Sequence, residues 1–249
     1  MTAPLPWKLV WITGASTGIG REVALQLAER GVTVAVSARS AEKLAGMGPN
    51  IRPFPLDVTD DAAVTKTIAK IETELGPIDL ALMGAGAYAP IGMDQIKPEL
   101  FASIMAVNYM GVVNGLAALI PIMRQRRRGH IAWIASVSGY RGLPKAAAYG
   151  PTKAALINLA ESLKPELGAL GITVSVVNPG FVETPMTKDN DFPMPFLMTL
   201  HDAAQRTIEG LAKGKFEVAY PTRFVAILKF ARLLPYSIYF GLIRRAVLK

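Results

Sequence analysis

The segment from Leu9 to Arg30 joins an apolar strand, a glycine-rich turn and an amphipathic helix. The strand ends at Thr13, and glycines follow at the spacing Gly-x-x-x-Gly-x-Gly from Gly14 to Gly20. Apolar residues then recur every four positions, which is typical of a helix with one buried face. Glycine lets a ligand approach the backbone, and the free amides at a helix N-terminus attract phosphate. The segment therefore predicts a dinucleotide site at the carboxyl end of a strand.

The chain lacks the features of several other kinds of site. No Gly-Lys-Ser/Thr follows the glycines, so a phosphate loop of the ATPase or kinase type is excluded. No cysteine occurs, which excludes disulfides, metal–thiolate sites and thiol catalysis. The two histidines, His130 and His201, are expected to be surface or packing residues, so we predict neither a metal site nor a Ser-His-Asp triad. A glycine turn without a nucleotide is the remaining alternative, and the flanking strand and helix disfavour it.

Strand and helix patterns alternate along the rest of the chain. Apolar runs predict further strands at Val32–Ala38, Ile51–Asp57, Ile78–Met83, His130–Ser136, Ile172–Asn178 and Phe216–Tyr220. Helical patterns separate most of them, including Asn108–Arg127 and Ala146–Ala169. This alternation is typical of an α/β fold with a doubly wound parallel sheet, a three-layer αβα sandwich. The third strand carries Pro53 and Pro55 and is therefore expected at an edge of the sheet.

Tyr149 and Lys153 lie four residues apart, so a helix places the phenol and the ammonium group on one face. Pro151 is tolerated only near a helix start, which predicts that this helix begins within 146–148. A nearby cation lowers the pKa of a phenol from its usual value of about 10, and the tyrosine then becomes a usable general acid or base. The alternative is a half-buried tyrosine beside a solvated lysine.

Several short motifs occur together and in a fixed order. They are Thr13-Gly14-x-x-x-Gly18-x-Gly20, Asp57-Val58, Asn108, Ser136, Tyr149-x-x-x-Lys153, and Asn178-Pro179-Gly180 followed by Thr184. In this order and spacing, the chain resembles the single-domain short-chain dehydrogenase/reductase family over about residues 7–221. The resemblance implies a Rossmann-like fold that binds NAD or NADP.

The resemblance also implies a role for each matching catalytic residue. Tyr149 would exchange a proton with the substrate oxygen, while Lys153 would lower the pKa of the phenol and hold the nicotinamide ribose. Ser136 would hydrogen-bond the reacting oxygen, although Ser138 is a nearby rival and an ordinary strand-end serine is the alternative. Asn108 would hold a water that connects Lys153 to solvent, whereas taken alone it would be a helix N-cap.

The cofactor site is expected to draw on most of these motifs. Its residues would be Gly14, Ser16, Thr17, Gly18, Ile19, Gly20, Arg39, Ser40, Asp57, Val58, Gly86, Tyr149, Lys153, Pro179, Gly180, Val182 and Thr184. Asp57 would contact adenine, and Thr184 would bind the carboxamide. Arg39 and Ser40 stand where a carboxylate that prefers NAD would be expected, and an arginine can pair with a 2′-phosphate. We therefore expect NADP(H), with NAD(H) possible; a solvated or adenine-stacked Arg39 is the alternative.

One motif departs from the family pattern. The family usually shows Asn-Asn-Ala-Gly after the fourth strand, but this chain has Met83-Gly84-Ala85-Gly86. The two amide side chains that brace neighbouring backbone are missing, so water must replace them or the bracing must be left out. We expect looser cofactor contacts, with the glycines still allowing close approach to the ribose.

The substrate region and the C-terminal extension are both apolar. Residues 1–221 are expected to form the domain for cofactor binding and catalysis, with a substrate lid at about 185–215. Methionine and phenylalanine are frequent between Pro185 and Met198, before a helix capped by Thr199. Such side chains favour a hydrophobic substrate over a sugar or phosphorylated compound, unless they only pack on the domain.

Residues 222–249 carry six Lys/Arg and no acidic residue among many aliphatic and aromatic side chains. The longest uncharged run, Leu233–Ile243, is too short to span a bilayer and contains Pro235. The segment could cover its own substrate cleft or a partner subunit, which we favour, or it could lie on a membrane surface. No nucleic-acid-binding motif is present.

The expected function is an NADP(H)-dependent oxidoreductase that interconverts a ketone or aldehyde and an alcohol on a small hydrophobic substrate. A non-catalytic NADP-sensing protein and a membrane-surface dehydrogenase for lipid-like or steroid-like compounds are the alternatives. The N-terminal residues do not have the pattern of a secretory signal, so we expect a cytoplasmic protein, possibly peripheral to a membrane. A homodimer or homotetramer is expected.

Overall fold

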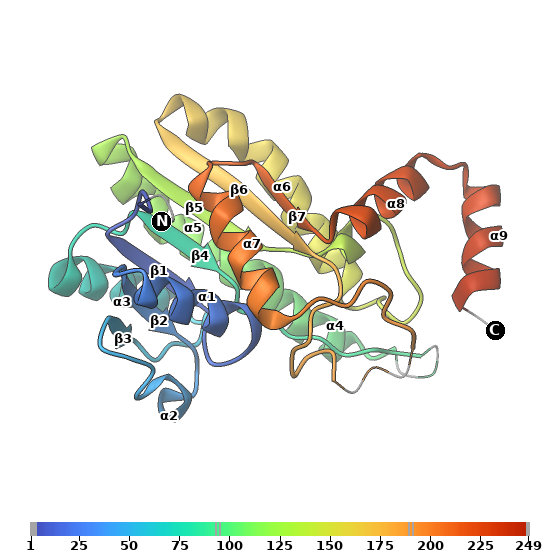
Figure 1. Ribbon diagram of the computed structural model, residues 1–249, viewed down its shortest axis with the longest axis horizontal. Helices are drawn as coiled ribbons and strands as arrows, with labels where there is room; N and C mark the ends of the chain where they lie inside the picture. Colours follow the sequence, from blue (N-terminus) through green and yellow to red (C-terminus); the bar gives the residue numbers. More distant parts are fainter. Residues whose placement is uncertain (1–3, 93, 95, 189, 191, 248–249) are drawn as a thin grey trace.

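Seven parallel strands form one sheet at the centre of the computed structural model, which describes residues 4–92, 94, 96–188, 190 and 192–247. The strands are β1 (Leu9–Thr13), β2 (Thr33–Ser37), β3 (Ile51–Pro53), β4 (Leu80–Met83), β5 (Gly129–Ile134), β6 (Ile172–Pro179) and β7 (Glu217–Tyr220). Their order in the sheet is β3-β2-β1-β4-β5-β6-β7 (Figure 1). The chain therefore reverses its direction of progress between β1 and β4, and the predicted doubly wound sheet is confirmed.

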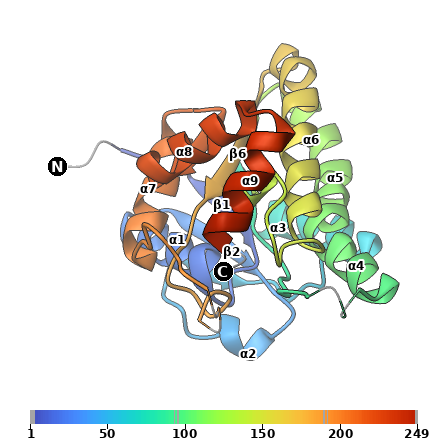
Figure 2. The same ribbon diagram turned by 90° about the vertical axis from the view of Figure 1, so that its right-hand side faces the viewer.

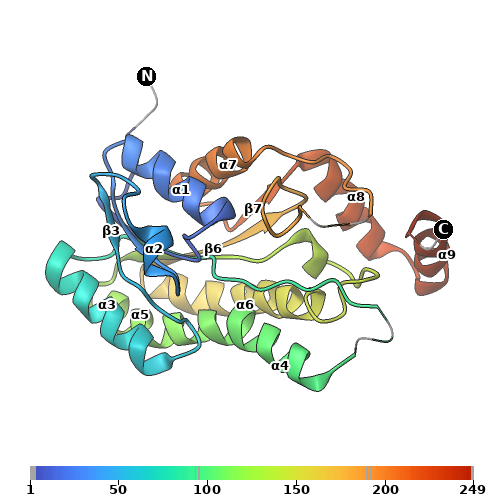
Figure 3. The same cartoon turned by 90° about the horizontal axis from the view of Figure 1, so that it is seen from below.

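Helices cover both faces of this sheet, which confirms the predicted three layers. They are α1 (Gly18–Glu29), α2 (Ala41–Leu44), α3 (Asp61–Leu75), α4 (Pro98–Met105), α5 (Gly111–Arg126), α6 (Gly150–Ala169), α7 (Leu200–Ala212), α8 (Thr222–Leu233) and α9 (Tyr236–Val247). Helices α1 and α7 lie on one face, while α3, α5 and α6 lie on the other (Figure 3). Each face has its own buried apolar cluster, so both faces of the sheet are shielded from solvent.

Buried aromatic side chains tie the layers together. Trp11 on β1 donates its indole N–H to Ser37 Oγ on β2 over 3.0 Å, which satisfies its polar atom inside the core. Trp133 on β5 donates to the carbonyl oxygen of Leu156 over 2.9 Å and so links the sheet to α6. The second bond holds β5 against α6, and three of the four predicted catalytic residues lie in or next to these two elements.

Most of the predicted strands agree with the structure to within two residues at each end, but the third strand is shorter. It ends at Pro53 instead of Asp57, although the amides of Phe54 and Leu56 still donate to the carbonyl oxygens of Val36 and Ala38 over 2.8 and 3.0 Å. Pro53 and Pro55 alternate with these donors, so the missing N–H groups do not interrupt these bonds. The position of the strand at the sheet edge, beside β2, is as predicted. The helix of Tyr149 also begins later than predicted: residues from Ala146 form a turn, and α6 starts at Gly150.

A π-helical segment, η2 (Ala106–Met110), joins α4 and α5 into one continuous helix. The helix Pro98–Arg126 is long and apolar enough to cross a membrane by length and composition. In this fold it packs on the sheet through buried Leu116 and Leu119. Asn108 lies within the π segment, so the expectation that it would otherwise be an N-cap is wrong: the helix continues through it.

The C-terminal part combines a packed helix with a projecting one. Residues 200–212 of the expected lid region form α7, which packs against α1, so only the loop before α7 borders the site. Thr199 caps α7 by accepting a hydrogen bond from the amide of Asp202, as predicted. After β7, helix α8 buries Phe224 and Val225, whereas α9 stands away from the sheet (Figure 1).

We expect the buried face of α5 to contribute more to the free energy of unfolding than the exposed face of α8. Leu119→Ala removes a fully buried side chain and should lower the free energy of unfolding by about 2–5 kcal/mol. Leu233→Ala makes the same chemical change at a residue that is 80% exposed and should change it by less than about 0.5 kcal/mol. Urea unfolding followed by circular dichroism measures both, and equal losses would contradict the assignment of these faces.

Candidate active site

The predicted site residues meet in one cavity of about 290 Å³ beyond the carboxyl ends of β1, β4, β5 and β6. Parallel strands direct their following loops to this edge, and the reversal between β1 and β4 leaves space for a ligand there. Of the predicted site residues, those that line the cavity are Gly14, Ser16, Thr17, Gly18, Ile19, Gly20, Gly86, Ser136, Tyr149, Lys153, Pro179, Gly180, Val182 and Thr184. Asn108, Arg39, Ser40, Asp57 and Val58 lie outside its lining.

The glycine turn has the geometry that a dinucleotide requires. Gly14 has φ +72°, and a Cβ added to it would lie 2.5 Å from the carbonyl oxygen of Gly84. Gly18, at φ +60°, has only the methyl end of Thr184 within 4 Å of such a Cβ, so its backbone faces open space. The side chain of Thr17 does not cap α1, and the amides of the first turn remain available for an anion. The cradle therefore fits the pyrophosphate of a dinucleotide.

Tyr149, Ser136 and Lys153 converge from two neighbouring elements. Ser136 follows β5, and its hydroxyl hydrogen-bonds Tyr149, which immediately precedes α6. Lys153 donates from Nζ to the carbonyl oxygen of Ile134 over 2.7 Å and lies 5.3 Å from the centre of the Tyr149 ring. Ser138, the rival serine, donates to Ser136 Oγ over 3.0 Å and so supports it. The structure therefore brings Ser136, Tyr149 and Lys153 together in the lining of one cavity.

Burial controls the proton affinities of this pair. Desolvation raises the pKa of the Tyr149 phenol above its usual value, the hydrogen bond from Ser136 opposes this rise, and Tyr88 adds to it. Desolvation also lowers the pKa of Lys153 to about 7. Lys153 is not among the groups that shift the pKa of Tyr149 in this structure, where burial destabilises the charged form of both residues. That Lys153 lowers the pKa of the phenol stays a prediction.

Asn108 is fully buried and connects three parts of the site. Its Oδ1 accepts from the amide of Ala87 over 2.7 Å, and its Nδ2 donates to the carbonyl oxygen of Ala87 and to Thr152 Oγ1, each over 3.0 Å. A Cβ added to Gly86 would lie 3.6 Å from Asn108 Oδ1 and 3.9 Å from Lys153 Nζ. Asn108 therefore approaches the Lys153 side of the cavity while it fixes the loop after β4.

The other predicted cofactor residues lie along the neighbouring strands at the same edge. Arg39 is exposed and follows β2, and Asp57 is exposed and follows β3. Two hydrogen bonds from Thr59 and the charge of Arg39 lower the pKa of Asp57 below its usual range. Ser40 accepts from the amide of Lys43 and caps α2. Val58 is buried against Gly111.

The segment Met83-Gly84-Ala85-Gly86 departs from the family pattern, but two of its backbone amides are hydrogen-bonded within the chain. Thr13 Oγ1 accepts from the amide of Gly84 over 3.1 Å and from that of Ala85 over 3.3 Å. Ile134 fills the space beside Gly84, where an added Cβ would lie 2.9 Å from Ile134 Cδ1. The amides of Gly84 and Ala85 therefore have a partner within the chain. The expectation that water replaces the two missing side-chain amides, or that their bracing is left out, stays a prediction.

Four aromatic side chains form part of the cavity lining, and we call them the aromatic wall. It consists of Tyr88, Phe181, Phe192 and Phe224, all of which line the cavity. Tyr88 meets the Tyr149 ring edge-on with centroids 5.1 Å apart, and Phe181 stacks on Phe224 at 5.6 Å. Phe192 lies in the predicted lid, whereas no motif or pattern in the sequence marks Tyr88 or Phe181. Phe224 belongs to the C-terminal segment that was predicted to cover the cleft or to lie on a membrane.

Neither histidine contributes to a metal site. Buried His130 shares a hydrogen bond of 2.8 Å with Ser175, and desolvation lowers its pKa to about 4. His201 lies beside Glu22 and is largely exposed. Within the described part of the chain, no group of three or more His, Cys, Asp or Glu residues could hold a metal ion.

Comparison with known proteins agrees with this site. A model of the family described as short chain dehydrogenase matches residues 8–193. An uncharacterized oxidoreductase of Myxococcus xanthus is 35% identical over an alignment of 250 residues, covering 98% of this chain and 99% of the relative. The 3-oxoacyl-[acyl-carrier-protein] reductase FabG of Escherichia coli is 37% identical over 185 residues, covering 73% of this chain and 76% of the relative.

A solved structure shows the same architecture with a nucleotide. ElxO with NADP bound has a TM-score of 0.76 and 28% sequence identity to this chain, and the match covers 86% of this chain and 97% of that one. The family match, the relatives and the cavity together show that the protein is an NAD(P)-dependent oxidoreductase and belongs to the short chain dehydrogenase family.

Proposed function

We propose that this protein interconverts a ketone or aldehyde and an alcohol on a hydrophobic substrate, using NADP(H). The observation that carries the proposal is the buried phenol of Tyr149, hydrogen-bonded to Ser136 at the wall of the cavity. Because burial raises its pKa, Tyr149 is protonated at neutral pH and suited to act as a general acid toward a carbonyl oxygen.

The nicotinamide, when bound, supplies the hydride for the carbonyl carbon. Tyr149 donates its phenolic proton to the carbonyl oxygen, and Ser136 hydrogen-bonds the same oxygen as negative charge develops there. The carbonyl becomes an alcohol, and Tyr149 becomes a phenolate. Lys153, with a pKa of about 7, can hold and release the proton that restores the phenol. In the oxidation direction, the same groups act in reverse.

The lining of the cavity supports a hydrophobic substrate. Beyond the catalytic groups, uncharged apolar side chains line the cavity, among them Leu143, Met186, Phe192 and Phe224. Methionine adapts to different shapes, so the site suits a family of related skeletons. The Escherichia coli relative is named for reduction of a 3-oxoacyl group, which agrees with a keto substrate.

Two features support NADP(H) over NAD(H). Arg39 is exposed at the edge where the adenosine end of a dinucleotide would lie, and a guanidinium can pair with a 2′-phosphate through two hydrogen bonds. ElxO, whose structure resembles this one, was solved with NADP. Asp57 lowers the net charge near Arg39 but does not occupy the position after β2.

We also propose that the protein is a cytoplasmic homodimer or homotetramer. Helices α5 and α6 lie side by side on the outer surface (Figure 2). Their side chains Ile120, Leu159 and Leu163 are only partly buried, and a second copy would cover them. The mass in solution, measured by light scattering, distinguishes these states from a monomer.

Tyr149→Phe should lower turnover by about 10²–10⁴-fold, because it removes the proton donor while leaving the ring in place. Binding of NADPH, measured by fluorescence titration, should remain. Tyr109→Phe removes the same hydroxyl from a residue that does not line the cavity and should keep turnover within about threefold. Normal turnover of a ketone by Tyr149→Phe would refute the mechanism.

Arg39→Asp should shift cofactor preference toward NADH by about tenfold or more, because a carboxylate repels the 2′-phosphate and accepts from a ribose diol. The measurement is kcat/KM for NADPH divided by kcat/KM for NADH. Lys43→Asp, on neighbouring α2, makes the same charge reversal and should leave this ratio nearly unchanged. Equal shifts in both variants would show that Arg39 contributes only general charge.

The low pKa of Lys153 predicts a dependence of stability on pH. The unfolded chain holds the proton up to about 10.5, whereas the folded protein releases it near 7, so the unfolded state binds more protons between these values. Stability should therefore rise as pH increases from 7 to 9, with roughly 2 kcal/mol arising from Lys153. Lys153→Met should remove this increment in urea unfolding of the nucleotide-free protein. An identical rise in both proteins would contradict the burial of an ionisable lysine.

A further inference from the structure

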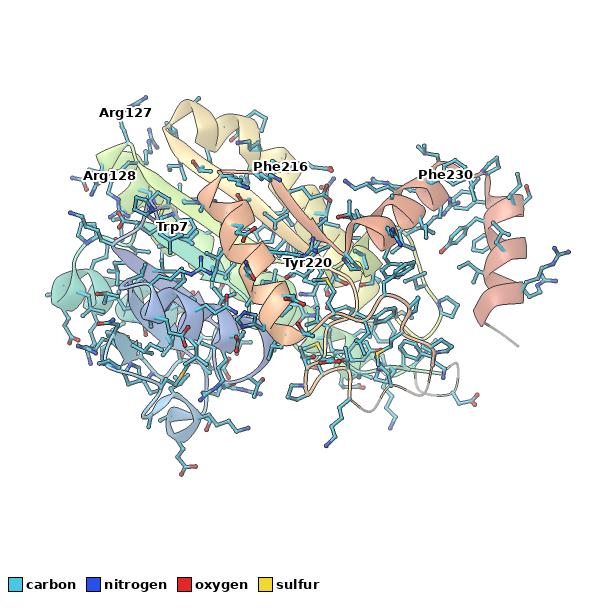
Figure 4. All side chains as sticks on the ribbon, viewed as in Figure 1. Trp7, Arg127, Arg128, Phe216, Tyr220 and Phe230 are labelled. Carbon is cyan, nitrogen blue, oxygen red and sulfur yellow. The ribbon has the colours of Figure 1, made fainter. Side chains whose placement is uncertain are left out.

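Helices α8 and α9 expose a continuous set of large apolar side chains, which we call the C-terminal apolar surface. Its members are each at least half exposed: Ile227, Phe230, Leu233, Tyr236, Ile238, Phe240 and Leu242. Phe230 is 66% exposed and lies toward the projecting end of the molecule (Figure 4). Scattered apolar residues on a surface are ordinary, but a patch of this extent on two successive helices marks an interaction site.

The position of α8 keeps this surface turned outward. The opposite side of α8 is buried through Phe224, which enters the cavity, and through Val225. Because the helix is anchored on that side, Ile227 and Phe230 cannot turn inward without emptying the cavity wall. The exposure therefore belongs to the packed arrangement of the domain.

Arg141 fixes the junction between the two helices. Its guanidinium donates to the carbonyl oxygens of Ala231 and Leu234, the latter over 2.9 Å, and lies 3.9 Å from the centre of the Tyr239 ring. The hydroxyl of Tyr239 in turn donates to the carbonyl oxygen of Gly142 over 2.6 Å. Helix α9 is thus held to the loop before α6, with its other aromatic side chains left exposed.

The charge of the same segment is entirely positive. Residues 222–249 contain no Asp or Glu. Lys229 pairs with Glu217 on β7, whereas the ion pairs among the described residues include none to Arg223, Arg232, Arg244 or Arg245. Exposed aromatic and aliphatic groups therefore alternate with cations that lack acidic partners in their own segment. This combination is typical of helices that lie at a lipid interface.

A second copy of the chain fits this surface less well. A twofold contact through α8 and α9 would bring the same unpaired arginines of two chains together, and like charges oppose such an interface. Anionic lipid headgroups offer the opposite charge, and their acyl region accepts the apolar side chains. We propose that the C-terminal apolar surface binds the surface of a membrane that contains anionic lipids, with α8 and α9 lying in the plane of the headgroups.

Membrane binding through α8 would also affect how a substrate reaches the cavity. Phe224 and the exposed Phe230 belong to the same helix, so contact through α8 places a wall of the cavity next to the lipid. A hydrophobic substrate dissolved in the membrane would then reach the site without crossing much water. The binding itself does not depend on which substrate the protein reduces.

The test is co-sedimentation of the full-length protein with vesicles of phosphatidylcholine, alone or with about one third phosphatidylglycerol. We expect at least about tenfold tighter binding to the anionic vesicles, and a loss of this excess as salt is raised. Phe230→Ser/Phe240→Ser should weaken binding by at least about tenfold, because it removes two buried rings from the lipid contact. Arg244→Glu/Arg245→Glu should weaken it by a similar factor.

Arg124→Glu/Arg128→Glu is the matched control for charge reversal. Both residues are exposed, and Arg128 lies at the opposite end of the molecule from Phe230 (Figure 4). This variant should bind vesicles within about twofold of the wild type if α8 and α9 form the contact. Equal losses in the two arginine variants, or equal binding to neutral and anionic vesicles, would overturn the proposal.

Light scattering of the same variants measures their mass in solution and so tests whether a second copy of the chain covers this surface. If Phe230→Ser/Phe240→Ser dissociates an oligomer and the wild type ignores vesicles, a second copy covers this surface and the proposal is wrong. Because vesicle binding is measured without substrate, its result does not depend on whether the protein reduces a carbonyl group. Circular dichroism of each variant confirms that the exposed substitutions leave the fold intact.

Discussion

The close passage of the turn after β1 beneath the end of β4 is the constraint on which the site depends. A Cβ on Gly14 would lie 2.5 Å from Gly84 oxygen, and a Cβ on Gly84 would lie 3.0 Å from Thr13 oxygen. Glycine at position 14, where φ is +72°, lets the two strands end side by side while their connections leave toward opposite faces. A side chain at this point would push the start of α1 outward. The amides that suit a pyrophosphate and the cavity beside them both follow from this contact.

Packing, more than charge pairing, controls the chemistry at the other side of the cavity. Trp133 joins β5 to α6, and this union buries Lys153 to 3% exposure beside the Tyr149 phenol. In such surroundings a charged form is costly on either residue, so the phenol keeps its proton and the ammonium loses its own more readily. The hydrogen bond from Lys153 Nζ to Ile134 oxygen remains possible in both charge states of the lysine. The site is thus prepared to donate a proton before any substrate enters.

The order of the strands and the place of the cavity were predictable from the sequence, because both depend on local patterns. Buried parallel strands appear as short apolar runs, and the edge position of β3 follows from its prolines alone. Three features were not predictable in this way. The start of α6 depends on a preceding turn from Ala146, the bracing of Gly84 depends on a hydroxyl 71 positions earlier, and the proton affinity of Tyr149 depends on burial. The last two are decided by contacts between segments that are distant in sequence.

The aromatic side chains of the cavity and the catalytic groups come from different parts of the fold. Phe181 and Phe192 come from the connection between β6 and α7, and Phe224 comes from α8, whereas Ser136, Tyr149 and the glycine turn are fixed by the strands and by α6. These three side chains can therefore change without disturbing the glycine turn or the groups that move protons. Natural variation or laboratory selection that altered only these side chains would produce enzymes with new substrates and unchanged chemistry. Evolvability of this kind is a property of where the side chains originate, and it requires no change in the central sheet.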